Sequence, residues 1–286
     1  MNRIRAKSPT RLVLFVLLAP LLGACGVKFL YNKLDWLVPW YIDDYVSLNS
    51  RQELLLDERL GPYLQRHRRQ QLPVYADFFD GIADAAQDGL DDDELRRLFK
   101  RTEQLGNELF ASIGPSFHEI FSELDDAQIA EIRRNLEDKN SELEDEYVHR
   151  EERYQRRARA EDMQKFLQRW LGELREDQIA MIEHWSGRYR LMGPGFLYSR
   201  RVWQARLFEV LQKRRDDPGF ESALTELFAN RYLGRTAQHQ QNFEFNESLL
   251  RDLYRRLSES MDSYQRAKLV REMRDYANDF RELSRQ

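Results

Sequence analysis

Apolar residues recur at helical spacing along most of the chain. Between positions 95 and 110, and again between 129 and 136, they fall three and four residues apart, on one face of an α-helix. We find no run that alternates apolar and β-branched residues with polar ones, as a half-buried strand would. The pattern predicts an all-α fold, an extended multi-helix bundle of about seven to nine helices.

A five-residue phrase marks the expected helix starts. It begins with Leu or Met, ends with Gln or Glu, and occurs at 48–52, 90–94, 124–128, 174–178 and 261–265. Asn or Asp in its second position can cap a helix, and Gln or Glu three residues later can close a capping box. Only Arg175 departs from this rule. Because the intervals are unequal, the phrases indicate separate helices and not a solenoid.

One stretch is almost free of apolar residues. Of the 26 residues in 137–162, 16 are charged, mostly acidic first and then basic. A helix without an apolar face has little to bury. The stretch therefore predicts one long, solvated helix, either a projecting arm or a strut between domains.

The first residues have the pattern of an export signal. Residues 1–11 hold four basic side chains and no acidic one, and residues 12–22 are an almost unbroken apolar run. Such a run is too short for a stable membrane span. We expect a signal peptide over residues 1–24, a juxtamembrane segment rich in aromatic residues over 25–47, and a helical domain over 48–286.

The end of this signal, Leu22-Gly23-Ala24-Cys25, resembles the lipobox of bacterial lipoproteins. The resemblance implies cleavage before Cys25 and acylation of its thiol and its new amino group, which would anchor the protein stably in a lipid bilayer. In the usual sorting rule for lipoproteins, Gly26 in place of Asp implies the outer membrane, with the domain facing the periplasm. The alternative is an ordinary signal peptide with a chance cysteine.

Charge and cysteine content exclude several functions. The 286 residues carry 45 basic and 49 acidic side chains, and without residues 1–24 the balance becomes 41 against 49, a net charge of −8. Nucleic-acid binding needs a basic surface, so nucleic acid is not an expected partner. Cys25 is the only cysteine, which excludes a disulfide within the chain and a cysteine-based metal or redox site.

Aromatic and acidic residues concentrate near the expected anchor. Asp35 with Asp43 or Asp44 could perform acid–base chemistry in a cleft, or bind a cationic or sugar-like ligand beside the aromatic rings. The alternative is that the rings are core residues and the aspartates are solvated or cap helices. The residues that we select as a binding site are Tyr31, Asp35, Trp36, Trp40, Asp43, Asp44, Tyr45, His67 and Arg68. The basic run 66–69, which includes the last two, could instead face lipid phosphates or cap a helix end.

Motifs for metal binding and nucleophilic catalysis are missing from the sequence. Glu146 and His149 have the Glu-x-x-His spacing of di-iron bundles, but that site needs a second copy, which the chain lacks. There is no Gly-x-Ser-x-Gly and no phosphate-binding glycine loop. We therefore predict no cofactor, no metal and no catalytic residues.

Two resemblances bear on function. The phrases at 124–128 and 174–178 resemble the Leu-Thr-x-x-Gln motif of the Spy and CpxP periplasmic chaperones, although Asp125 and Arg175 replace its Thr and this chain is about twice as long. The second resemblance is to an uncharacterised family of proteobacterial lipoproteins and covers nearly the whole mature chain. Its hallmarks here are residues 31–36, residues 40–45 and His67-Arg68 before Leu72-Pro73.

The chaperone resemblance implies a helical protein that cradles unfolded clients, whereas the lipoprotein family brings no activity with it. We therefore expect non-enzymatic binding of unfolded or envelope proteins, chaperone-like or scaffold-like. The alternative is a periplasmic enzyme or small-ligand binder that uses the aspartates near the anchor.

Overall fold

The computed structural model describes residues 24–286, and within them it is all-α, which confirms the predicted fold class. Its elements are more numerous than expected. They are α2 (Ala24–Tyr31), α3 (Leu34–Ile42), α4 (Ser50–Gln70), α5 (Leu72–Asp88), α6 (Asp92–Ala111), α7 (Ile113–Glu123), α8 (Asp126–Glu144), the π-helical turn η2 (Asp145–His149), α9 (Glu152–Leu171), α10 (Glu176–Arg188), α11 (Gly193–Gln212), α12 (Phe220–Ala229), α13 (Ala237–Ser260) and α14 (Ser263–Ser284).

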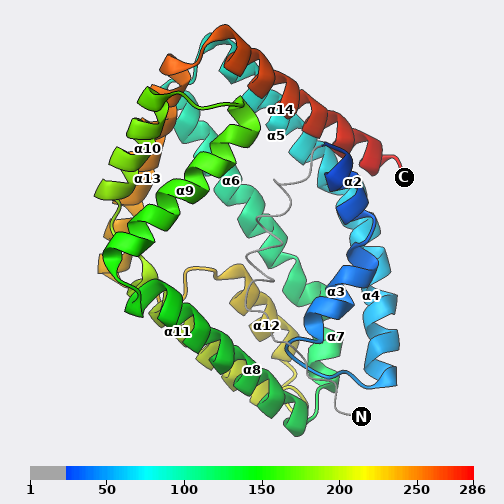
Figure 1. The fold of residues 1–286 in the computed structure, drawn as a ribbon. Coiled ribbons are helices and arrows are strands. Elements are labelled where there is room, and N and C mark those ends of the chain that lie inside the picture. The colour runs from blue at the N-terminus through cyan, green and yellow to red at the C-terminus, as the bar shows by residue number, and fades with distance from the viewer. Residues whose placement is uncertain (1–23) are drawn as a thin grey trace, which may run out of the picture.

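Pairs of helices form the edges of an open, polygonal frame (Figure 1). Along successive edges, α5 lies beside α14, α10 beside α13, and α8 beside α11. The remaining edge holds α4 with α2 and α3, while α6 runs across the frame towards α7 and α12. Residues far apart in the sequence are thus neighbours, as α2 and the end of α14 show.

The apolar core is divided in the same way. The largest cluster joins α5, α9, α10, α13 and α14 around the fully buried Ile182 and Leu283. A second cluster joins α8, α11 and α12 around Leu211 and Leu224, and a small third one lies between α4 and α7. Each edge of the frame is therefore stabilised mainly by its own apolar contacts.

The five phrases begin α4, α6, α8, α10 and α14, as predicted. Asn49, Asp91 and Asp125 each complete a capping box with the Gln or Glu three residues later. Asp262 caps α14 by accepting from the Gln265 N–H, without the reciprocal bond, and Arg175 has no side-chain acceptor at all. Its guanidinium donates instead to the Ser260 carbonyl at 2.7 Å, which ties the start of α10 to the end of α13.

The charged stretch 137–162 differs from the single solvated helix that we expected. It is divided at η2 and again at Arg150, whose extended backbone (ψ 135°) separates η2 from α9. Both parts pack through polar contacts: Asn140 on α8 is buried against Gln204. Arg156 on α9 donates to the carbonyl of Ser186 at 2.8 Å. Because these contacts are polar, the apolar pattern could not indicate them.

The predicted export signal lies outside the described residues except for Ala24. From residue 24 onwards, the structure has no helix of the length and apolarity that crossing a bilayer requires.

Candidate binding surfaces

Three of the sequence-predicted site residues, Tyr31, His67 and Arg68, lie together where α2 meets α4, α5 and α14. The Tyr31 hydroxyl is 2.9 Å from His67 Nδ1, and the Tyr75 hydroxyl is 3.2 Å from His67 Nε2. Burial lowers the pKa of His67 to about 4 and raises that of Tyr31 to about 12. The Arg68 guanidinium lies 5.0 Å from the centre of the Tyr31 ring and donates to the Leu283 carbonyl. This cluster holds helices together.

The other predicted residues do not join that cluster. Trp36 and Trp40 stack on each other with ring centres 6.1 Å apart, and Trp36 is 62% exposed. The Tyr45 hydroxyl lies 2.9 Å from the Tyr41 hydroxyl.

The three aspartates of the enzyme alternative lie at or near the surface. Asp35 is exposed and accepts from its neighbour's backbone, the Trp36 N–H, at 2.9 Å. Asp43 is also exposed and Asp44 is only partly buried. A general acid or base acts from a cleft that surrounds the reacting atoms, whereas Asp35 and Asp43 lie on exposed surface.

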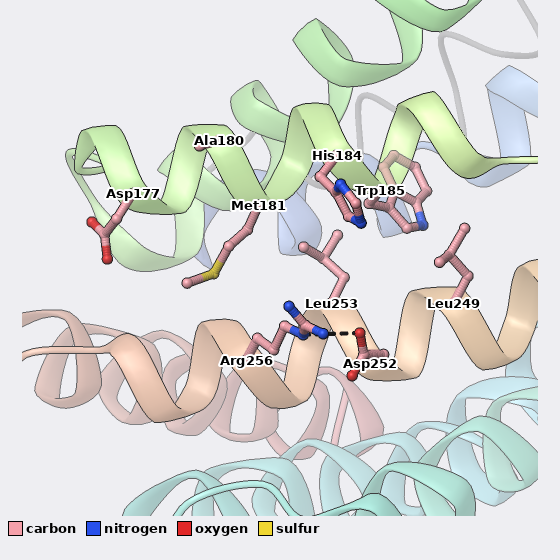
Figure 2. Close-up of a pocket in the computed structure, with 9 residues that line it drawn as sticks. All are labelled: Asp177, Ala180, Met181, His184, Trp185, Leu249, Asp252, Leu253 and Arg256. Atoms are coloured by element: carbon pink, nitrogen blue, oxygen red, sulfur yellow. Dashed lines mark ion pairs between the residues drawn. The ribbon is translucent and has the colours of Figure 1, made fainter.

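A half-open pocket of about 280 Å³ lies between α10 and α13 (Figure 2). Met181, Trp185, Leu249 and Leu253 form its apolar wall, and Arg256 and Asp252 form an ion pair at 2.9 Å on one side. Partial burial would raise the pKa of Asp252, but hydrogen bonds and charge from Arg255 and Arg256 lower it. Its carboxylate is therefore a poor proton donor, and the pocket offers a small apolar contact surface more than a reaction centre.

The most distinctive surface lies where α6, the connection 230–236 and the start of α13 meet. The Arg231 guanidinium lies 4.6 Å from the centre of the Phe110 ring. The Arg235 guanidinium lies 4.2 Å from the Tyr232 ring and 4.7 Å from the Phe243 ring. We call these five residues the aromatic–arginine patch. Phe110 is 42% exposed and Tyr232 37% exposed, so these two rings are partly open to a partner, while the Tyr232 hydroxyl donates to the Glu103 carboxylate.

The connection that carries this patch is held in one conformation. Gly234 has φ +78°, and a Cβ there would fall 2.6 Å from the Val202 side chain on α11. Ser199 donates to the Gly234 carbonyl at 3.2 Å, and Thr236 caps α13 by accepting from the His239 N–H. The patch is thus presented on a fixed support, which lowers the entropic cost of binding.

Sequence reasoning missed this patch. Phe110 and Arg231 are 121 positions apart, and only the fold brings them together. The one local indication was the run Arg231-Tyr232 with Arg235 close behind, two arginines alternating with an aromatic residue in a segment rich in polar residues.

No group of three or more His, Cys, Asp or Glu side chains that could hold a metal ion occurs in residues 24–286. His149, half of the Glu-x-x-His motif, has its Nδ1 atom 3.0 Å from Asp145 and is well exposed. This pair is an ordinary surface contact between neighbouring turns.

Comparison with known proteins assigns a family. The model of a family of unknown function, DUF6279, matches residues 44–234, about two thirds of the chain. The chain belongs to this family. No curated protein and no solved structure is significantly similar to it. The DUF6279 region includes Phe110, Arg231 and Tyr232 and ends just before Arg235 and Phe243.

Proposed function

We propose that this protein is a lipoprotein of the bacterial outer membrane whose periplasmic helical domain binds other proteins without enzymatic chemistry. The observation that carries the proposal is the aromatic–arginine patch. It supports a chaperone-like or scaffold-like role, in which unfolded clients or envelope proteins are held by contact alone.

The patch has the composition of a protein-binding surface. Tyr and Arg are among the residue types that most often dominate binding energy at protein interfaces, and Phe is enriched there. The arginines are stacked on rings in the free protein, so little further side-chain entropy is lost when a partner binds. An apolar segment that reaches the rings would bury their exposed area.

The charge of the patch indicates the chemistry of the partner. Both guanidiniums donate to neutral side-chain amides, Arg231 to Asn107 at 3.2 Å and Arg235 to Gln240 at 2.9 Å. Within residues 24–286 neither guanidinium pairs directly with Asp or Glu, although the Glu103 carboxylate accepts from the Tyr232 hydroxyl beside them. We therefore expect a partner segment that combines apolar residues with acidic ones.

The lipid anchor has indirect support from the start of the fold. Helix α2 begins at Ala24, Val27 is buried in the largest apolar cluster, and Lys28 pairs with Asp279 at 2.9 Å. The domain therefore begins within a few residues of Cys25. Incorporation of labelled palmitate, present in the native chain and lost in Cys25→Ser, tests the anchor separately from binding.

The test of binding is suppression of client aggregation. Aggregation of two chemically unfolded clients, one acidic and one basic, is followed by light scattering. Each is measured with and without the mature chain, which carries Cys25→Ser. We expect suppression at near-equimolar ratio, stronger for the acidic client. The variant Phe110→Ser/Tyr232→Ser should lose most of it, because both rings are exposed and their removal leaves the core intact.

The matched control is Tyr264→Ser, which removes an equally large exposed ring, 66% exposed, on α14. It should keep full suppression. If neither client is protected, or if the control loses as much as the patch variant, the patch is not a client-binding surface.

A further inference from the structure

The first helix of the domain buries one face and exposes aromatic surface on the other. On α2, Val27 is 9% exposed, Lys28 pairs with Asp279, and Tyr31 contacts His67. Phe29, between them in sequence, is 66% exposed. At about 100° per residue, Phe29 lies roughly opposite the packed face. Its ring is therefore not explained by the core.

Helix α3 repeats this arrangement. Val38 and Ile42 pack against the cluster between α4 and α7. Trp36 lies on the opposite side, 62% exposed and stacked on Trp40. The two helices follow each other along α4 (Figure 1). The backbone between them stays almost helical, since Asn32 N–H donates to Lys28 and Leu37 N–H donates to Lys33. We call Phe29, Trp36 and Trp40 the aromatic edge.

The residue proposed to carry the lipid, Cys25, lies close to this edge along the chain. It precedes Phe29 by four residues on the same helix, so both positions fall on one side of α2. An anchor there leaves no flexible linker between the acyl chains and the domain. Tryptophan favours the headgroup region of a bilayer, where its ring is half in apolar and half in polar surroundings.

We propose that the aromatic edge lies in the headgroup region of the bilayer that holds acylated Cys25, and that it fixes the orientation of the domain on the membrane. The inference rests on the proposed lipid anchor. The exposed charged residues that flank the edge, Lys33, Asp35 and Asp43, suit a headgroup depth and not the hydrocarbon. Because their charges are mixed, we expect insertion into zwitterionic lipid and no requirement for anionic lipid.

The experiment uses the full, acylated protein in phosphatidylcholine vesicles. Once Cys25 is acylated, the chain has no free thiol, so Phe29→Cys, Trp36→Cys and Tyr264→Cys each accept one environment-sensitive fluorophore. Position 264 is the matched control: it is 66% exposed, like Phe29, but lies about 27 Å along α14 from the Lys28–Glu282 contact. Quenching by aqueous iodide is measured in detergent and in vesicles.

We expect iodide quenching at positions 29 and 36 to fall several-fold in vesicles, with a blue shift of emission, and quenching at 264 to stay unchanged. Vesicle flotation reports the anchor separately. If the protein floats with the vesicles but iodide still quenches all three fluorophores, this inference is wrong and the proposed lipid anchor stands. Protein that does not float and carries no acyl chain overturns both.

Discussion

Gln52 and Gln128 donate hydrogen bonds to each other's side-chain oxygens, at 2.9 and 2.7 Å, although they are 76 residues apart. Gln178 and Gln265 form the same reciprocal pair at 2.9 and 3.0 Å. The glutamines of the recurring phrase therefore do more than close capping boxes. They join α4 to α8 and α10 to α14 at their first turns. The copy that ends in Glu94 is not paired in this way, since an ionised carboxylate cannot donate.

Loss of one glutamine should destabilise the fold. Gln52 is 1% exposed and also donates to the Glu123 carbonyl at 2.8 Å, so Gln52→Ala leaves buried polar groups without partners. We expect a loss of about 1–3 kcal/mol in the free energy of unfolding, measured by urea denaturation. The exposed neighbour Glu53 provides the control, since Glu53→Ala should change stability by at most about 0.5 kcal/mol. Equal effects for the two variants would show that the glutamine pair is not stabilising.

A buried arginine should resist conservative replacement. Arg214 is 7% exposed, and its guanidinium donates to the carbonyls of Leu124 at 2.6 Å and Leu211 at 3.0 Å, besides pairing with Asp126. A lysine cannot reach all three acceptors in that geometry. We expect Arg214→Lys to cost about 2 kcal/mol of stability. Thermal denaturation measures both variants. Arg215→Lys, at the exposed neighbouring position, should cause no measurable loss of stability. A similar loss of stability in the two variants would contradict a special role for Arg214.

Two glycines should respond to alanine in opposite directions. A Cβ at Gly193 would clash with the Tyr147 carbonyl oxygen, so Gly193→Ala must force α11 away from η2 and should destabilise the protein by more than about 1 kcal/mol. Gly61 lies within α4 with nothing near its Cβ position. Gly61→Ala should therefore stabilise the protein by about 0.5–1 kcal/mol through helix propensity. Chemical denaturation of each variant measures the change in stability. If Gly193→Ala leaves stability unchanged, the close contact between α11 and η2 does not exist.

The buried histidine should make stability depend on pH. The pKa of His67 is about 4 in the folded protein and about 6.5 in the unfolded chain, so between these values the unfolded state binds more protons. Stability is then complete above pH 6.5 and falls as the pH drops towards 4, by about 2 kcal/mol at pH 5. His67→Gln should remove this part of the pH dependence in urea titrations at pH 7 and 5. An unchanged slope in the variant would assign the dependence to other groups.

The helix starts could be predicted from sequence because capping is local: Asn49 and Gln52, or Asp125 and Gln128, interact across three residues. The pairing of those glutamines across the fold could not, since no local rule selects the partner of a buried amide. For the same reason, the packing of the charged stretch 137–162 could not be predicted, because buried polar contacts such as Asn140 with Gln204 leave no apolar pattern in the sequence.

The residues selected from the sequence as a site do not form one cluster in the structure. The sequence drew attention to aromatic residues near the expected lipid anchor, and Tyr31, His67 and Arg68 do meet, but as a partly buried helix junction. The aromatic–arginine patch combines positions from α6 and α13, whose proximity follows from packing between distant segments. Clustering near one another in sequence was therefore a poor guide to clustering in space.

Hydrogen–deuterium exchange can locate a bound protein at the aromatic–arginine patch. Exchange of the mature chain is compared with and without an equimolar unfolded acidic client. The account predicts slower exchange in the connection 230–236 and the last turns of α6, with α14 unchanged. No protection anywhere, or protection confined to other helices, would contradict it.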